Sequence, residues 1–459
     1  MESVKGKRIF PIAWLAIACM AAAMGAEAPT TPVLPPVRHP GGGQVVYFLL
    51  TDRFANGSSA NDRGGIAGES VSAHGFDPTR VQFYHGGDLV GLTGRLDYLQ
   101  RLGVSAIWIT PPFVNKPVQG GFGSGSAGYH GYWITDFLNI DPHLGTLEQM
   151  RAFVDAAHAR GIRVYCDIVV NHTADVITPS GGGGYVSKFS FRYRDAEGNV
   201  FDDRAFAANG IVNPDFPAMS AVTSFPRPPV VAAGEPTKKP AWLNDLTNYH
   251  NRGDSAFSGE DYNYGDIAGL DDLFTEKREV LEGFIEVYRY WIETVGFDGF
   301  RIDTVKHVNP EFWQGFSPAI RRIAREAGIE DFLQFGEVFN GDPRYLSQWS
   351  TAAGIDTVLD FGLVFQMREF VSRGRSSDTL YNLFDQDDLY TDHDSNAASL
   401  VTFLGNHDIG RFGFFLREDN ALAPDERLLD LAELGYGLLF TVRGQPCVYY
   451  GDEQGMVGT

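Results

Sequence analysis

Short apolar runs of strand length alternate with stretches of helical periodicity along most of this chain. The clearest strand covers residues 162–170, where IRVYCDIVV is almost continuously apolar, as expected for a strand buried on both faces. The helix before it is predicted to begin at Thr146, because Gln149 three residues later completes a capping-box pattern, and to end at Gly161. Strands that alternate with helices in this way are typical of a parallel sheet.

Eight strands of this kind are predicted. They cover residues 45–50, 104–110, 162–170, a run ending at 303, 332–337, 356–360, 399–404 and 446–450. Helices are predicted over residues 91–103, 146–161, 310–327 and 427–441, and over a stretch with apolar residues from Leu281 to Val295. Eight strands with intervening helices predict an α/β fold, a (β/α)₈ TIM barrel.

The alternation of strands and helices is interrupted between the third strand and the third helix. Residues 171–275 are polar and rich in Gly and Pro, and we interpret them as an inserted domain, because so long a connection is rarely structureless in a compact protein. The barrel then falls into a first part, 44–170, with strands one to three, and a second part, 276–459, with strands four to eight. Because the chain ends nine residues after Tyr450, we expect the last barrel helix to be missing from this sequence.

The N-terminus has the composition of an export signal. Lys5, Lys7 and Arg8 precede an apolar run over 9–24, and Ala-Glu-Ala at 26–28 offers a cleavage site. We therefore predict a signal peptide over 1–28, a Pro- and Gly-rich tether over 29–43, and a secreted or periplasmic protein. The run is short for a membrane span, so we expect no membrane association after cleavage. The alternative is a lipoprotein anchored through Cys19.

Charge and cysteine content limit the partners. The net charge of −21 argues against nucleic acid or an anionic membrane as the main partner, and it suits a neutral ligand with bound cations. Cys166 and Cys447 lie within apolar runs and are expected to be buried thiols rather than a disulfide. We expect a monomer.

Ionisable side chains follow several of the predicted strands at their carboxyl ends, where the active site of such a barrel is built. These side chains are Asp167, Asn171 and His172 after strand three, Arg301 and Asp303 after strand four, Glu337 after strand five, and His407 and Asp408 after strand seven. No zinc-binding Cys/His spacing, phosphate-binding glycine loop or G-x-S-x-G elbow accompanies them.

Paired carboxylates at one mouth suggest glycoside hydrolysis, in which a retaining mechanism needs an ionised nucleophile and a protonated acid. Asp303 stands beside cationic Arg301, which should keep it ionised. Glu337 is flanked by apolar residues, which should raise its pKa and favour the acid/base role. Asp408 would then stabilise positive charge in the transition state. The alternative for each carboxylate taken alone is a structural cap or ion pair.

These clusters resemble the conserved regions of the α-amylase family of glycoside hydrolases. The matching stretches are DIVVNH at 167–172, GFDGFRIDTVKH at 296–307, FGEVF at 335–339 and FLGNHD at 403–408, in the same order as in the family. The resemblance implies that Asp303 is the nucleophile, Glu337 the general acid/base and Asp408 the transition-state stabiliser. It also implies a retaining hydrolase of α-1,4-glucosidic bonds in α-glucans such as starch, and a β-sandwich domain that often follows the barrel but is missing here.

The resemblance extends to substrate-binding residues. YHGYW at 129–133 is similar to a family segment that contacts the sugar, in which Tyr132 would stack on the ring and His130 would bind its hydroxyls. The alternative is that Tyr132 packs a loop. The remaining residues implied to contact substrate are His172, Arg301, Lys306, His307 and His407.

Calcium is the cofactor that the resemblance implies, since the candidate ligands are all oxygen donors. One Ca²⁺ site would use Asn171, Asp272 and the carbonyl group of His307. A second is similar to a site in the related cyclodextrin glucanotransferases and would use Asn56, Asn61, Asp62, the carbonyl group of Gly86, and Asp88. The alternative for the loop at 56–62 is an ordinary polar turn.

Two other functions stay open at this point. The same scaffold could carry a transglycosylase or an α-glucosidase, which the products formed from soluble starch would distinguish. A non-catalytic glucan-binding protein would be expected to lack at least one of the three carboxylates, and all three are present.

Overall fold

The computed structural model describes residues 43–120, 125–207 and 215–458. Eight parallel strands form its central sheet, in the order β14-β13-β12-β7-β2-β1-β16-β15. The strands are β1 (Val46–Leu49), β2 (Ala106–Ile109), β7 (Arg163–Ile168), β12 (Gly299–Ile302), β13 (Leu333–Gly336), β14 (Thr357–Val358), β15 (Val401–Phe403) and β16 (Gln445–Tyr449). A parallel bridge between Leu359 and Val401 joins the two outermost strands, so the predicted (β/α)₈ barrel is confirmed.

Side chains alternate between the two faces of the barrel wall. Phe48, Trp108, Tyr165 and Phe335 belong to one buried cluster, which fills the barrel interior, whereas their neighbours in sequence pack outward. Asp167 lies two residues after inward-facing Tyr165, and Glu337 two residues after inward-facing Phe335. Because residues two apart on a strand face the same side, both carboxylates point into the mouth of the barrel.

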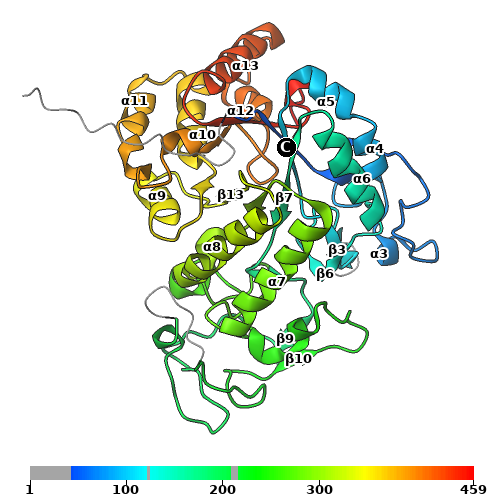
Figure 1. Ribbon diagram of the computed structural model, residues 1–459, viewed down its shortest axis with the longest axis vertical. Coiled ribbons are helices and arrows are strands. Elements are labelled where there is room, and N and C mark those ends of the chain that lie inside the picture. The colour runs from blue at the N-terminus through cyan, green and yellow to red at the C-terminus, as the bar shows by residue number, and fades with distance from the viewer. Residues whose placement is uncertain (1–42, 121–124, 208–214, 459) are drawn as a thin grey trace, which may run out of the picture. The chain divides into compact units, whose positions relative to one another are not determined.

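Helices pack against the outside of the strands (Figure 1). They are α2 (Thr51–Phe54), α3 (Val71–His74), α4 (Leu89–Thr93), α5 (Leu96–Leu102), α6 (Leu147–His158), α7 (Arg278–Val295), α8 (Pro310–Glu326), α9 (Pro343–Thr351), α10 (Phe361–Met367), α11 (Asp378–Phe384), α12 (Phe412–Asp419) and α13 (Asp425–Leu439). Short helical turns are η1 (Asp203–Ala205), η3 (Ala241–Asn244), η4 (Leu246–Asn248), η5 (Gly259–Tyr262), η6 (Val305–His307), η7 (Arg368–Ser372), η8 (Asp387–Tyr390), η9 (Ala397–Ser399) and η10 (Asp452–Gln454).

The prediction of a single helix over 91–103 was wrong, because the chain breaks between α4 and α5. Asp88 caps α4 through a hydrogen bond from the amide of Gly91, and it also accepts hydrogen bonds from the amides of Gly57 and Ser58. A Cβ atom on Gly91 would lie 2.0 Å from the carbonyl oxygen of Ala55. The loop over 55–58 therefore fixes α4 in place, and the helical direction changes at Gly94–Arg95.

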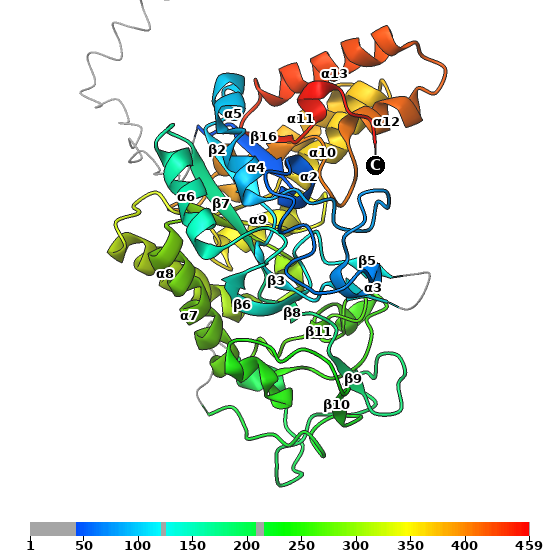
Figure 2. The same ribbon diagram turned by 90° about the vertical axis from the view of Figure 1, so that its right-hand side faces the viewer.

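Residues 171–275 lie between β7 and α7, and the part of this segment that the structure describes carries only short elements. These are β8 (His172–Thr173), β9 (Ile177–Pro179), β10 (Pro229–Val231), β11 (Asp271–Asp272) and several of the helical turns. Figure 2 shows β9 and β10 away from barrel strands β2 and β7. A smaller set of strands, β3 (Phe113–Asn115), β4 (Val118–Gln119), β5 (Ser126–Ala127) and β6 (Ile134–Ile140), follows β2.

The predicted signal peptide and most of the tether fall within residues 1–42, outside the described part of the chain. Among the described residues, no helix combines the length and apolar character that crossing a bilayer requires. Cys166 and Cys447 are buried and unpaired, as expected.

The capping box at the start of α6 gives a stability prediction. The side chain of Thr146 accepts a hydrogen bond from the amide of Gln149, and the side chain of Gln149 accepts one from the amide of Thr146. Substitution Thr146→Ala should lower the free energy of unfolding by about 1 kcal/mol, because one amide loses its acceptor. Urea unfolding followed by circular dichroism measures this. Thr146→Ser keeps the acceptor and should unfold near the unaltered midpoint; equal loss in both variants would contradict the capping role.

Candidate active site

The guanidinium group of Arg301 is the centre of the candidate site. It is fully buried, and its Nη1 lies 2.8 Å from Asp167 and 2.7 Å from Asp303, while its Nη2 lies 3.0 Å from Glu337. Backbone register explains part of this, since Arg301 on β12 stands opposite Asp167 on β7 and Phe335 on β13. Asp303 and Glu337 therefore flank one guanidinium group at one mouth of the barrel.

The two flanking carboxylates have pKa values that are shifted in opposite directions. Burial alone would raise the pKa of Asp303, but Arg301, His172 and His407 outweigh it, so this pKa lies below its ordinary value. Burial also has the largest effect on Glu337, whose pKa is raised to about 8. Repulsion from Asp303 and Asp408 raises this pKa as well, whereas Arg301 lowers it. At neutral pH the site thus holds an ionised Asp303 and a protonated Glu337.

The backbone holds the carboxylate of Glu337 from a second direction. The amide of Thr304 donates to Oε2 of Glu337 at 3.0 Å, and the amide of Val305 donates to its carbonyl oxygen at 3.0 Å. Thr304 adopts a left-handed conformation with φ of 50°, which is unfavourable for a β-branched residue. The turn after Asp303 therefore points an amide group at Glu337 at the expense of local strain.

Aromatic and imidazole rings surround Asp303 on one side. Tyr132 and His407 are stacked with ring centroids 5.4 Å apart, and His130 lies 5.7 Å from Tyr132. Burial lowers the pKa of His130 to about 3, and it also lowers the pKa values of His172 and His407, so all three imidazoles are neutral at pH 7. His172 Nε2 and His407 Nδ1 are buried and have no hydrogen-bond partner among the described residues. Such atoms are available to substrate hydroxyl groups.

Asp408 is the most exposed of the three predicted carboxylates. It lies in the loop after β15, where Asn406 accepts a hydrogen bond from its amide, and its side chain is 40% exposed. Its negative charge raises the pKa of Glu337, which places it within electrostatic range of the acid.

A pocket of about 310 Å³ opens on the other side of Glu337. Its walls come from the barrel and from the segment over 171–275, and it is lined by Phe257, Tyr262, Thr304, Lys306, His307, Glu337 and Phe339. His307 and the backbone carbonyl group of Tyr262 form a hydrogen bond of 2.7 Å, and the ammonium group of Lys306 donates to the carbonyl group of Phe339 at 3.1 Å. Lys306 and His307 thus line the pocket beside Glu337.

The first candidate calcium site brings Asn171 and Asp272 together by pairing β8 with β11, and the side chain of Asn171 hydrogen-bonds to Asp272. The carbonyl group of His307 accepts a hydrogen bond from Asn263. Asp266 accepts the amide of Asp272, and burial and repulsion from Asp272 and Asp271 raise its pKa well above the ordinary value. His250 pairs with Asp272 at 2.6 Å and compensates part of this negative charge. The oxygen donors gathered here are of the kind that calcium prefers.

The second candidate site also gathers its predicted residues. Asn56 donates to Asp62 at 2.8 Å, and a Cβ atom on Gly86 would lie 2.6 Å from both side chains, so the three residues are in contact. Asn61 donates to the carbonyl group of His143, while its Oδ1 atom is buried and has no partner within the described chain. The carboxylate of Asp88 accepts hydrogen bonds from three backbone amides. The unpartnered oxygen of Asn61 fits a cation at this loop.

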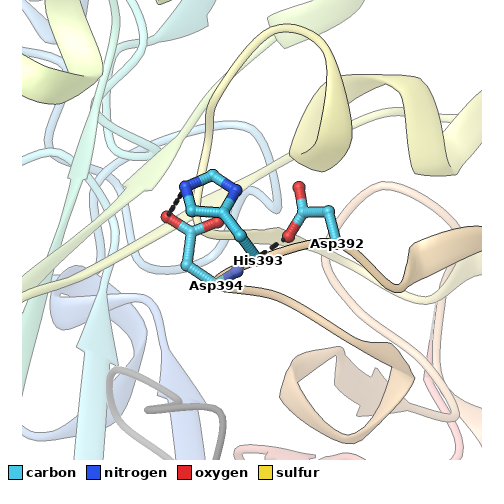
Figure 3. Close-up of side chains that lie close together, drawn as sticks. All are labelled: Asp392, His393 and Asp394. Atoms are coloured by element: carbon cyan, nitrogen blue, oxygen red, sulfur yellow. Dashed lines mark hydrogen bonds and ion pairs between the residues drawn. The ribbon is translucent and has the colours of Figure 1, made fainter. Parts of the chain in front are cut away.

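A third acidic cluster, which the sequence analysis did not identify, is formed by Asp392, His393 and Asp394 (Figure 3). Asp392 accepts hydrogen bonds from the amides of Asp394 and Ser395 and from the hydroxyl group of Ser395. Because these bonds explain the turn without a ligand, the cluster carries no function in our account.

The sequence placed Asp167 at the end of strand three but did not show its partners: it accepts hydrogen bonds from Tyr132 and Trp108 as well as Arg301. Sequence reasoning missed two further groups of residues. Phe257 and Tyr262 lie in a segment without periodicity, so nothing in the sequence placed them beside Glu337. Asp266 is the first aspartate of DIAGLDD, and the sequence analysis did not identify it as a candidate metal ligand.

Comparison with known proteins agrees with this geometry. The family model described as "Alpha amylase, catalytic domain" matches residues 48–459. An alpha-amylase of Streptomyces lividans is 46% identical over 386 residues, which are 84% of this chain and 42% of that protein. A cyclomaltodextrin glucanotransferase of Klebsiella oxytoca is 28% identical over 439 residues, covering 89% of this chain and 58% of that protein. The chain thus spans less than two thirds of the length of these curated relatives.

Solved structures give the same result. An Anoxybacillus alpha-amylase matches with a TM-score of 0.65 at 30% identity and covers 90% of this chain and 72% of its own. The alpha-amylase of Geobacillus thermoleovorans, solved in complex with acarbose, matches with a TM-score of 0.63 at 30% identity and the same coverage. With the family model matching nearly all of the described residues, the chain belongs to the alpha-amylase family.

Proposed function

We propose that this chain is a retaining hydrolase of α-1,4-glucosidic bonds in starch-like glucans, of the alpha-amylase type. One observation carries the proposal: two carboxyl groups flank a single buried guanidinium group, and their pKa values are shifted in opposite directions. A retaining mechanism needs such a pair, with one member ionised and the other protonated.

The reaction would proceed in two steps. The carboxylate of Asp303 attacks the anomeric carbon while the bond to the leaving sugar breaks, and Glu337 transfers its proton to the departing oxygen. The ionised Glu337 then removes a proton from water, which attacks the anomeric carbon and releases Asp303. Asp408 would stabilise the positive charge that develops on the sugar in both transition states.

Neighbouring side chains would hold the sugar. The ring of Tyr132 offers a flat stacking surface, while its hydroxyl group is held by Asp167 at 2.8 Å. Neutral His130, His172 and His407 would donate hydrogen bonds to sugar hydroxyl groups, and Arg301 would orient Asp303. Lys306 and His307 would contact the leaving-group side.

Transglycosylation is a second candidate, favoured by the aromatic walls of the pocket beside Glu337. Phe257 and Phe339 are 48% and 42% exposed and could hold an acceptor sugar in place of water. Several relatives are named cyclomaltodextrin glucanotransferases. Cyclic or lengthened glucans from soluble starch would identify this activity, dominant glucose would identify an α-glucosidase, and linear maltooligosaccharides would support the hydrolase.

We also propose calcium as a structural cofactor at one or both of the candidate sites, held by Asn171, Asp272, Asp266 and the carbonyl group of His307, and by Asn56, Asn61, Asp62, Gly86 and Asp88. A bound ion would neutralise buried carboxylates and link the segment over 171–275 to the barrel. The sequence of residues 1–28 supports export, so we propose a secreted or periplasmic enzyme.

Two substrates with different leaving groups distinguish the role of the nucleophile from that of the acid. Asp303→Asn should lower turnover by roughly 10³-fold or more on both starch and α-maltosyl fluoride, because neither reaction can proceed without the nucleophile. Glu337→Gln should lose starch hydrolysis but still release a rapid burst of fluoride, whose departure needs no proton, and then stall at the glycosyl-enzyme until azide replaces water, because the second step has lost its base. Initial rates at matched thermal stability measure both. Turnover of the fluoride by Asp303→Asn at the unaltered rate would refute the assignment.

The two pKa values predict the pH dependence of kcat/KM. Asp303 must be ionised, and its pKa is lowered, so the acid limb should fall below the ordinary range of a carboxyl group. Glu337 must be protonated, so activity should be full well below pH 8 and decline as the pH rises through about 8. The Glu337→Gln variant assayed on α-maltosyl fluoride should lack the alkaline limb. An alkaline limb that persists in this variant would assign it to another group.

Calcium removal should lower the melting temperature of the chain. A ligand present at 100 times its Kd stabilises a protein by about 2.7 kcal/mol, and a chelator abolishes that contribution. Differential scanning calorimetry with EDTA or CaCl₂ measures the difference, which should shrink in Asp272→Asn and in Asn61→Ala. Asp392→Asn is the control and should keep the full difference in melting temperature, because the carboxylate of Asp392 accepts hydrogen bonds from the amides of Asp394 and Ser395 in its own turn. Equal melting with and without calcium would refute the proposal.

A further inference from the structure

A second groove lies on the outer surface of the barrel, against the first half of α7. It has a volume of about 610 Å³, within the usual size of ligand pockets, and it is open to solvent. Its floor is formed by Trp242 and Gly283, and its rim includes Glu279, Glu282 and Glu286. No hydrogen bond or ion pair found in the described residues joins these groups to the site around Arg301. The groove is therefore separate from the candidate active site.

The indole ring of Trp242 lies flat on the helix. A Cβ atom on Gly283 would be 2.4, 2.6 and 2.8 Å from Cε2, Cζ2 and Nε1, which are adjacent ring atoms, so one ring face covers the backbone of Gly283. Phe284 supports the ring edge-to-face, with centroids 5.2 Å apart. Trp242 also lines the groove. Trp242 is half-buried, and its Nε1 donates to no group within the described part of the chain.

The rim determines which ligand suits this aromatic surface. The side chains of Glu279, Glu282 and Glu286 are 53%, 56% and 66% exposed. Each lies near a cation, at 3.9 Å from Lys277, 2.6 Å from Arg278 and 3.2 Å from Arg289, respectively. Acceptor groups around a flat ring suit a neutral sugar chain, whose apolar face stacks on indole and whose hydroxyl groups donate to carboxylates. An apolar peptide would desolvate these charged side chains without satisfying them.

We propose that this groove binds a second stretch of the α-glucan whose bonds the active site cleaves, a proposal that rests on the proposed function for the identity of its ligand. α7 runs back along the outside of the barrel from the level of the active site, so its first turns lie near that end of the molecule. A long glucan held at the groove would have a raised effective concentration at the active site. Short substrates cannot reach both sites and would gain nothing.

Adsorption to starch granules tests the groove apart from catalysis. In an Asp303→Asn background, which keeps the granules intact, Trp242→Leu should lower the adsorption constant by about fivefold, the effect of losing one aromatic contact of about 1 kcal/mol. Trp242→Tyr keeps a flat ring and should adsorb nearly as well as the parent. Phe189→Ala removes an aromatic side chain that is 99% exposed outside any groove, and adsorption should not change.

The same variants with Asp303 restored should hydrolyse maltotriose at the unaltered rate. Gly283→Ala displaces the indole ring without removing it, and should weaken adsorption if Trp242→Leu fails to fold. Unchanged adsorption in both variants would overturn the proposal, as would a parallel loss of maltotriose turnover. So would concentration-dependent dimerisation in sedimentation that Trp242→Leu abolishes, since the occupant would then be a second copy. Absence of soluble-starch hydrolysis by the unaltered chain would instead refute the proposed function.

Discussion

Burial of the Arg301 guanidinium group is the constraint on which the rest of the site depends. A charged group in a dry environment is tolerated only with partners, and here three carboxyl groups share one cation. If all three were ionised, the cluster would carry a surplus of negative charge that the barrel interior cannot solvate. Burial raises the pKa of Asp167 to about 7 and that of Glu337 to about 8, so Glu337 keeps its proton to the highest pH of the three. Burial is the largest cause of the raised pKa of Glu337, and the charge balance adds to it through repulsion from Asp303 and Asp408.

Strand register keeps this balance in place. Arg301, Asp167 and Phe335 occupy opposed positions on three neighbouring strands, and side chains alternate between the inside and the outside of the barrel. A shift of one residue in β12 would turn Arg301 outward among the helices and leave Asp167 buried without its cation. The large inward rings of Phe48, Trp108 and Tyr165 fill the barrel below the site and oppose such a shift. Core packing and the catalytic arrangement are therefore the same structural requirement.

The sequence was sufficient for those parts of the molecule where a period or a motif exists. The barrel strands were predictable because apolar runs of strand length recur between helices, and Asp303 and Glu337 because each ends such a run. Asp271 shows the limit: it pairs with Lys238 and accepts hydrogen bonds from the amides of Val176 and Ile177, and these partners come from two separate places in an aperiodic segment. The break between α4 and α5 was missed for a similar reason, since a loop distant in sequence imposes it.

His307 connects the proposed calcium site to the substrate pocket. Its carbonyl group faces Asn263 and would be a metal ligand, while its ring forms a hydrogen bond with the backbone of Tyr262 in the wall of the pocket beside Glu337. Tyr262 and Phe257 belong to the segment over 171–275, whereas Lys306 and Phe339 belong to the barrel, so the pocket exists only while the two are held together. An ion between Asn171, Asp272 and His307 would fix that junction. Metal binding would then act on the leaving-group side of the active site through one residue, with no contact between ion and substrate.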